Sequence, residues 1–478
     1  MELLETYKKL VKSRYFSIAP IAIAVISIFS QTRSLLDQHS DIILSGASWL
    51  KDHAILYAQV WSSHSPQTLY FGYIYNRYLS ESFWQYAFEL LFFLLAFWLL
   101  RQFLKLLQPK KDVQSNLLLL FTALITVPGV WSFGLSDQKL GFIFLVAMYF
   151  AYYSWKNSKK SYWVLGETSK NWRFMLLAGI SFSLLINTSI LYSVFFIPIL
   201  VDFIKSNPKK WDFKLKWSAL FYIPAIVEAW VWLSYLSSRN LFRLFIDAIL
   251  VNIREQFGSR ILSTSLPLII FGALLLIIAL THSSASQFKK NTLRWVTGIL
   301  IVFSLVFATR FVILSVIFGF FVMVLLYKRQ AQVIIKANLI GSVALSMIVL
   351  SIPLTILRDR REKLAIAEVD LASAYIQQRQ IESNTVIYYG LGAGFYERTG
   401  LQSSSRFVNL GVLEYDNESS DLGSFFRGDS EGSTPMFLAY STNEYLKMPL
   451  IPRIKEYISK HYQKTAEIDG FDIYKRKN

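Results

Sequence analysis

The sequence predicts a mainly α-helical, polytopic membrane protein of about 11 transmembrane helices, with a small α/β extracytoplasmic domain at its C-terminal end. Apolar residues make up 54% of the 478 residues and charged residues only 17%, whereas soluble proteins carry about 25% charged residues. Apolar runs long enough to cross the ~30 Å hydrocarbon core recur up to Leu357. Beyond that residue the composition is that of a soluble protein.

The candidate spans are separated by connectors, as expected for helices that cross a bilayer in succession. A basic flank without a small-residue cleavage site precedes the first one, so we expect this span to be retained rather than removed as a signal peptide. The fifth and sixth meet near Asn187 and could form a helical hairpin with almost no loop. The predicted spans are 16–32, 83–104, 114–133, 140–155, 174–187, 188–204, 218–236, 261–281, 293–309, 311–327 and 337–357.

Lysine and arginine residues predict how these helices are oriented. They are concentrated in the connectors that lie on the same side as the N-terminus, for example 101–112, 156–173 and 205–217. Because cytoplasmic connectors carry an excess of Lys and Arg, we predict a multi-pass protein of the plasma (inner) membrane with a cytoplasmic N-terminus. The same asymmetry accounts for the net charge of +17. We therefore expect membrane lipids as partners, and no nucleic acid.

Two domains are predicted along the chain. Residues 1–357 form a transmembrane domain, which includes a long first outside loop at 33–82, and residues 358–478 form a soluble extracytoplasmic domain. In the soluble part, helical spacing of apolar residues and a proline near the start of the second segment predict two helices. Strands that alternate with helices predict a small α/β domain. The predicted helices are 364–379 and 449–462, and the predicted strands are 385–391, 435–441 and 471–477.

Arginine residues near the outer surface are candidates for binding a phosphate group. Residues 237–260 have apolar residues at helical spacing, which predicts an amphipathic helix at the membrane interface, and they include Arg243, Arg254 and Arg260. Arg310 lies between two apolar spans with no other charge nearby. The guanidinium group matches phosphate oxygens. Alternatively, these side chains could extend to ordinary lipid headgroups.

Two aspartates are candidates for acid–base chemistry. Asp41 begins a helix-like run in the first outside loop, and Asp137 lies in the short second outside loop. A carboxylate at the membrane edge could accept a proton from a hydroxyl group. It could equally stabilise the N-terminus of a helix. Lys139 could pair with Asp137 or approach a phosphate, and the residues alone leave both alternatives open.

Metal ions and cofactors are not expected. The chain has no cysteine, so a disulfide or thiolate zinc site is excluded. The histidines of the first loop, His39, His53 and His64, are too widely spaced for a compact metal-ligand pattern. The glycines at 390–394 lack the third glycine of a dinucleotide-binding fingerprint, and we interpret them as a turn.

The order of these features resembles the GT-C superfamily of membrane glycosyltransferases, in particular the bacterial branch near protein O-mannosyltransferases and the lipid A aminoarabinose transferase. The resemblance lies in the segment 41–66, in Asp137 at the second outside loop, and in the tail from residue 385 to 407. It extends over the whole chain in layout, although the motifs are loose. The chain departs from the family pattern at His64, Gln67 and Asn187.

The resemblance implies an enzyme that transfers a hexosyl or pentosyl group from a polyprenyl-phosphate donor to a hydroxyl group at the outer face of the membrane. It implies inversion at the anomeric carbon, with Asp41 as the base, Asp137 as a second acid, and no cofactor. The acceptor would be a glycan, a lipid or a protein. The cations that hold the phosphate would be Lys139, Arg243, Arg254, Arg260 and Arg310.

Two other interpretations remain. A non-catalytic GT-C-like membrane protein could act in cell-envelope glycan assembly or transport. A transporter is disfavoured because ionisable residues inside the predicted spans are few, Glu89 and Glu228 being the notable ones. Glu228 lies near the middle of a span, where a carboxyl group needs a partner or a proton.

Overall fold

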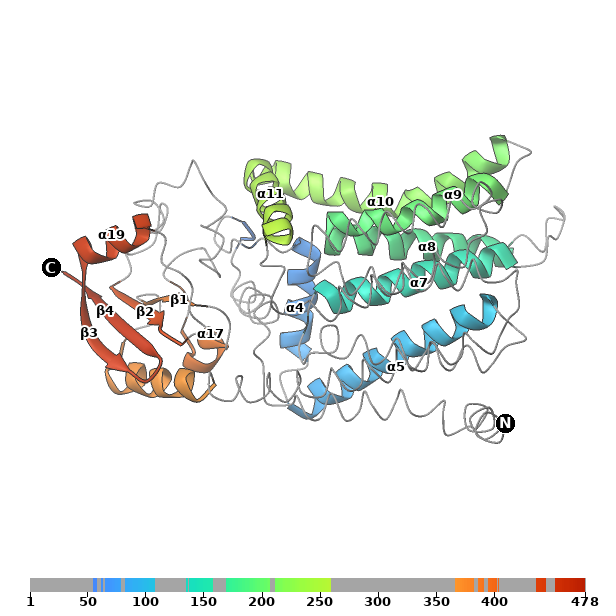
Figure 1. The fold of residues 1–478 in the computed structure, drawn as a ribbon. Helices are drawn as coiled ribbons and strands as arrows, with labels where there is room; N and C mark the ends of the chain where they lie inside the picture. Colours follow the sequence, from blue (N-terminus) through green and yellow to red (C-terminus); the bar gives the residue numbers. More distant parts are fainter. Residues whose placement is uncertain are drawn as a thin grey trace, which may run out of the picture.

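A bundle of long helices lies beside a small β-sheet in the computed structural model, and the helices α4 and α11 lie between these two parts (Figure 1). The structure describes residues 55–57, 62, 65–78, 82–107, 135, 137–157, 169–206, 211–258, 366–381, 386–390, 394–401, 403, 436–443 and 452–477.

Four long helices run side by side in the bundle (Figure 1). They are α5 (Ser82–Leu107), α7 (Asp137–Asn157), α8 (Ser169–Thr188) and α10 (Trp211–Ser238). Each contains one of the predicted spans and has 20 residues or more, so each is about 30 Å long or longer at 1.5 Å per residue. The structure therefore confirms that these four predicted spans are helical. The spans predicted at 16–32, 114–133, 261–281, 293–309, 311–327 and 337–357 lie outside the described residues.

The predicted hairpin near Asn187 is present. Helix α8 ends at Thr188, Ser189 alone forms the reversal, and the chain returns as a 3₁₀ helix, η1 (Ile190–Phe196), continued by α9 (Ile197–Ser206). The rings of Phe182 and Phe196 lie 4.6 Å apart between the two limbs. The difference from the prediction is the 3₁₀ geometry, which is common where a chain turns directly into a helix.

The bundle helices expose apolar side chains that a soluble core would cover. Two described helices, α5 and α10, are long and apolar enough to cross a membrane. In the most apolar stretch of each helix, only 33% of the residues of α5 and 11% of those of α10 are buried inside the protein. Leu91, Leu215 and Trp230 are each more than 60% exposed. Soluble monomers rarely expose large contiguous apolar patches. The bundle surface therefore fits a hydrocarbon environment.

Two further helices lie at one end of the bundle. Helix α11 (Phe242–Gly258) confirms the helix predicted within 237–260. Helix α4 (Pro66–Tyr78) lies across the ends of the long helices, in the segment that the sequence places in the first outside loop (Figure 1). The two helices meet in a small apolar cluster, in which Leu69 and Ala248 pack with Leu236 at the end of α10.

The C-terminal part contains a mixed four-stranded sheet with the strand order β1-β2-β4-β3. Only β1 and β2 are parallel, and β4 is antiparallel to both β2 and β3. The strands are β1 (Val386–Tyr389), β2 (Phe437–Ser441), β3 (Tyr462–Ile468) and β4 (Phe471–Arg476), and the helices are 366–378, α17 (Phe395–Thr399) and α19 (Pro452–His461). These elements confirm all three predicted strands and both predicted helices.

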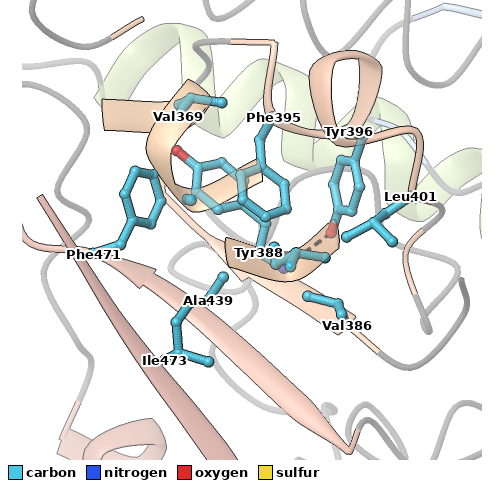
Figure 2. Packing of buried hydrophobic residues seen from close by; sticks show 11 residues of the cluster. Val369, Val386, Tyr388, Phe395, Tyr396, Leu401, Ala439, Phe471 and Ile473 are labelled. Atoms are coloured by element: carbon cyan, nitrogen blue, oxygen red, sulfur yellow. Dashed lines mark hydrogen bonds between the residues drawn. The ribbon is translucent and has the colours of Figure 1, made fainter. Parts of the chain in front are cut away.

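The sequence analysis missed β3 and the short α17. Strand β3 lies at the edge of the sheet, and most of its side chains are at least partly exposed, so its sequence lacks the apolar alternation of a buried strand. The predicted glycine turn precedes α17, where Gly394 has a φ of 62°. Residues of the helix 366–378 and of β1, β4 and α17 form the core of the domain, in which Tyr388 and Phe395 stack 4.3 Å apart (Figure 2).

Candidate functional site

The first turn of α4 is fixed by a capping arrangement that its sequence specifies. Ser65 precedes the helix, and its hydroxyl oxygen accepts a hydrogen bond from the backbone N–H of Thr68 at 3.2 Å. Pro66 occupies the first helical position, where a missing N–H costs nothing. Serine before a helix-starting proline is a strong start signal. The helix therefore begins at the bundle end with residues 66–69 all buried.

Asp137 joins this turn to the start of α7. The hydroxyl group of Thr68 donates a hydrogen bond to Oδ1 of Asp137 at 2.9 Å. Asp137 is the first residue of α7 and is only 8% exposed, so its charge also lies near the positive end of that helix. The carboxylate is therefore enclosed where α4 crosses α7. The position fits both alternatives for Asp137, the capping role and a role in a polar site.

Lys139 and Glu89 form a buried ion pair beside this contact. The ammonium group of Lys139 donates to Oε2 of Glu89, and the side chains are 1% and 4% exposed. The hydroxyl of Tyr75, on α4, donates to Oε1 of Glu89 at 3.4 Å. Lys139 therefore pairs with Glu89 on α5, a partner that was not among the two predicted for it, Asp137 and a phosphate. This also gives Glu89, an acid inside a predicted span, its partner.

Tyr57 belongs to the same end of the bundle. It has a φ of 67°, which is rare for a bulky residue, and it is 1% exposed. Its ring packs edge-on against Phe245 of α11 at 5.8 Å. Burial, helped by the nearby Tyr235, raises the pKa of Tyr57 well above its usual range. The phenol therefore stays protonated at neutral pH.

Gln67 is the unusual member of the first turn of α4. The residue is only 7% exposed, and neither Nε2 nor Oε1 has a hydrogen-bond partner in the part of the chain that the structure describes. A buried polar group left without a partner costs about 1–3 kcal/mol. The sequence analysis noted Gln67 only as a departure from a family pattern. A polar residue directly after a helix-starting proline is the signal that could have drawn attention to it.

The structure places one predicted phosphate-binding arginine near this end. Arg243 is exposed in the first turn of α11, the helix that packs on α4. Arg254 lies in α11, but its side chain is not among those described. Asp41, Arg260, Arg310, His39, His53 and His64 lie outside the described residues. Within the described part of the chain, no group of three or more His, Asp or Glu side chains could hold a metal ion.

Two further polar contacts lie elsewhere in the bundle. Glu228 of α10 accepts a hydrogen bond from the hydroxyl of Ser183 on α8, which supplies the partner that its mid-span position requires. At the other end of α7, Lys156 donates to Asp202 of α9 at 2.6 Å. The four buried or mid-bundle carboxylates Glu89, Asp137, Asp202 and Glu228 are thus each held by a lysine or by a hydroxyl group.

These features together make up the fold: a bundle of long apolar helices, a helix lying across one end of it, and a small sheet domain on that side. Solved structures that share this fold include two of ArnT from Cupriavidus metallidurans. The crystal structure bound to undecaprenyl phosphate has a TM-score of 0.59 at 12% identity and covers 96% of this chain and 97% of ArnT.

The apo crystal structure of the same ArnT gives a TM-score of 0.56 at 13% identity, with the same coverage of both chains. At this identity the likeness is one of fold. Comparison of the sequence with protein-family models and with curated proteins finds no match.

Proposed function

We propose that this protein is an integral membrane glycosyltransferase that takes a sugar from a polyprenyl-phosphate donor. The observation that carries the proposal is the fold shared over 96% of the chain with ArnT, which was crystallised with undecaprenyl phosphate. The enclosed polar cluster at the α4 end supports it, because chemistry on a charged lipid headgroup needs polar groups shielded from water.

The proposed reaction is a direct displacement at the anomeric carbon. The bond between the sugar and the phosphate oxygen breaks, polyprenyl phosphate leaves with that electron pair, and the acceptor hydroxyl oxygen forms the new bond with inversion. The hydroxyl proton passes to a carboxylate, for which we propose Asp41, with Asp137 as the second acid. The acceptor is a glycan, a lipid or a protein, and the sugar is a hexosyl or pentosyl group.

Cations at the outer face complete the proposal. Arg243, Arg254, Arg260 and Arg310 are the candidates that hold the phosphate as negative charge develops on it. The position of Arg243 on α11, beside α4, supports this assignment for that residue. Lys139 remains a candidate, but its ammonium group must first exchange Glu89 for a phosphate oxygen.

The second candidate is a non-catalytic protein of the same fold that binds the lipid in envelope glycan assembly or transport. The buried pairing of Lys139 with Glu89 favours it, because that cation is already neutralised. Turnover separates the two functions: only the enzyme releases free polyprenyl phosphate and leaves the sugar on an acceptor.

The test is transfer by the full chain in lipid nanodiscs. Labelled undecaprenyl-phosphoryl sugars are incubated with envelope lipids and glycans, and label transfer and free undecaprenyl phosphate are measured. Asp41→Asn should lower the rate by about 10²–10⁴, the usual contribution of a general base. The variant should stay folded, because Asn caps a helix as well as Asp.

Binding of undecaprenyl phosphate without any turnover of a sugar panel would favour the non-catalytic candidate. Absence of binding would contradict both candidates. Full activity of Asp41→Asn would remove Asp41 from the mechanism and leave Asp137 to be tested in the same way.

A further inference from the structure

The polar groups of the first turn of α4 are satisfied except for one side chain. Ser65 Oγ and Thr68 Oγ1 lie 3.0 Å apart, and the Thr68 hydroxyl donates a hydrogen bond to Oδ1 of Asp137 at 2.9 Å. Gln67 stands between these partnered residues, is 7% exposed, and has no hydrogen-bond partner for either amide atom among the described residues. Because the large majority of buried polar atoms are hydrogen-bonded, this exception requires an explanation.

The hydrogen-bonding capacity of the Gln67 carboxamide limits which chemical groups could be its missing partner. Gln67 offers two N–H donors and a carbonyl acceptor side by side. A phosphate group only accepts hydrogen bonds and would leave Oε1 unsatisfied, and a polyprenyl chain would satisfy neither atom. Sugar hydroxyl groups both donate and accept. A pair of neighbouring sugar hydroxyls can therefore satisfy both ends of the carboxamide at once.

The position of Gln67 in the structure is consistent with sugar hydroxyl groups as its partner. It is one residue away from Thr68, whose hydroxyl holds Asp137, and it lies on the helix that covers the Lys139–Glu89 pair. Its whole turn is buried, whereas Tyr70, one turn further along α4, is exposed. The amide atoms are thus buried at this end of the bundle and not turned outward to bulk water.

We propose that Gln67 is a sugar-binding residue that hydrogen-bonds hydroxyl groups of the lipid-linked donor. The proposal rests on the proposed function, and it adds the part of the substrate that this end of the bundle recognises. Such a residue discriminates a donor that carries a sugar from the bare polyprenyl phosphate that remains after transfer. Product release is then favoured, because the product no longer contacts Gln67.

The test compares two lipids on two variants of the full chain in nanodiscs. Gln67→Met keeps the length of the side chain and removes its hydrogen bonds. Gln102→Met, on the last turns of α5, is the matched control with the same chemical change. Dissociation constants are measured for undecaprenyl phosphate and for a panel of undecaprenyl-phosphoryl hexoses and pentoses, together with the melting temperature of each protein.

The expected result is a loss of about 10-fold or more in affinity for the sugar-linked lipids bound by the native protein, which corresponds to about 1.4 kcal/mol. Affinity for bare undecaprenyl phosphate, the melting temperature and the Gln102→Met control should be unchanged. The melting temperature should not fall, because the Gln67 amide makes no hydrogen bond within the described part of the protein that the change would remove.

Three results would overturn the inference. Unchanged affinity for both lipids would mean that Gln67 holds at most a water molecule, while the proposed function would stand. A lower melting temperature with an equal loss for both lipids would assign Gln67 a structural role. If the native chain binds neither lipid, the proposed function fails, and this inference fails with it.

Discussion

The two ends of α7 carry the same kind of ion pair in different surroundings. Near the start of the helix Lys139 pairs with Glu89, and near its end Lys156 pairs with Asp202. Each carboxylate also accepts a hydrogen bond from a tyrosine hydroxyl. The first pair is 1% and 4% exposed, whereas the second is 30% and 20% exposed.

Helix α4, which lies across the ends of the long helices, supplies the tyrosine that contacts the first pair, whereas the tyrosine at the second pair, Tyr152, belongs to α7 itself. Taking charges out of water is costly, and a buried pair is retained only where its geometry and further hydrogen bonds offset that cost. At the end of α7 that carries Lys139 and Glu89, two charges are therefore buried at a cost in free energy. This is the property expected of a site, and it agrees with the end at which we place the reaction.

The contrast between the two ends of α7 bears on function only through which of them lies outside the cytoplasm. The predicted odd number of spans and cytoplasmic N-terminus lead us to expect that the α4 end and the C-terminal domain are extracytoplasmic. A reporter enzyme that is active only outside the cytoplasm, fused after Asn478, should therefore be active. A reporter that requires the cytoplasm should be silent at the same position. The opposite pattern would place the enclosed pair at the cytoplasmic face and remove the proposed reaction from the outer surface.

The next largest effect is expected at the enclosed pair. Glu89→Ala should destabilise the protein by about 3–5 kcal/mol, because Lys139 is left buried without its carboxylate partner. The measurement is unfolding in mixed detergent–SDS micelles. The double variant Glu89→Met with Lys139→Met is the control, and it should recover most of the loss because apolar side chains suit this buried position. A single variant as stable as the native chain would show that the pair is hydrated.

The smallest effect is expected at the open end of α7. Asp202→Asn should change stability by less than about 1 kcal/mol, because a partly exposed pair is screened by water. The amide oxygen can still accept the hydrogen bond that Tyr152 donates at 2.9 Å. The same unfolding assay measures it. An effect as large as that of Glu89→Ala would contradict the contrast between the two ends.

The long helices were predictable because their signal is local. The apolar runs that became α5, α7, α8 and α10 give their positions directly, and the reversal near Asn187 followed from two runs that meet without a connector. Helix α4 was missed because its 13 residues are too few to cross a membrane, so the segment was assigned to the first outside loop although Ser65 and Pro66 form a helix-start signal.

The site was only partly predictable. Asp137 was identified, but the partner of Lys139 is Glu89, which lies 50 residues away on another helix. That pairing depends on how α5 packs against α7, which periodicity within one segment does not determine. In the sequence, Gln67 stood out only as a polar residue directly after the proline that begins α4. Its significance comes from the missing hydrogen bonds, which only the packed structure shows.

The single-residue reversal at Ser189 has a consequence for how the protein is made. The returning limb, η1 with α9, has only 17 residues, yet it reaches about 30 Å, because a 3₁₀ helix rises about 2.0 Å per residue and an α-helix about 1.5 Å. A limb this short that carries Asp202 is a poor candidate for independent entry into lipid. We therefore expect helix α8 and the returning limb to enter the bilayer together as one hairpin, with α7 already in place to receive the carboxylate.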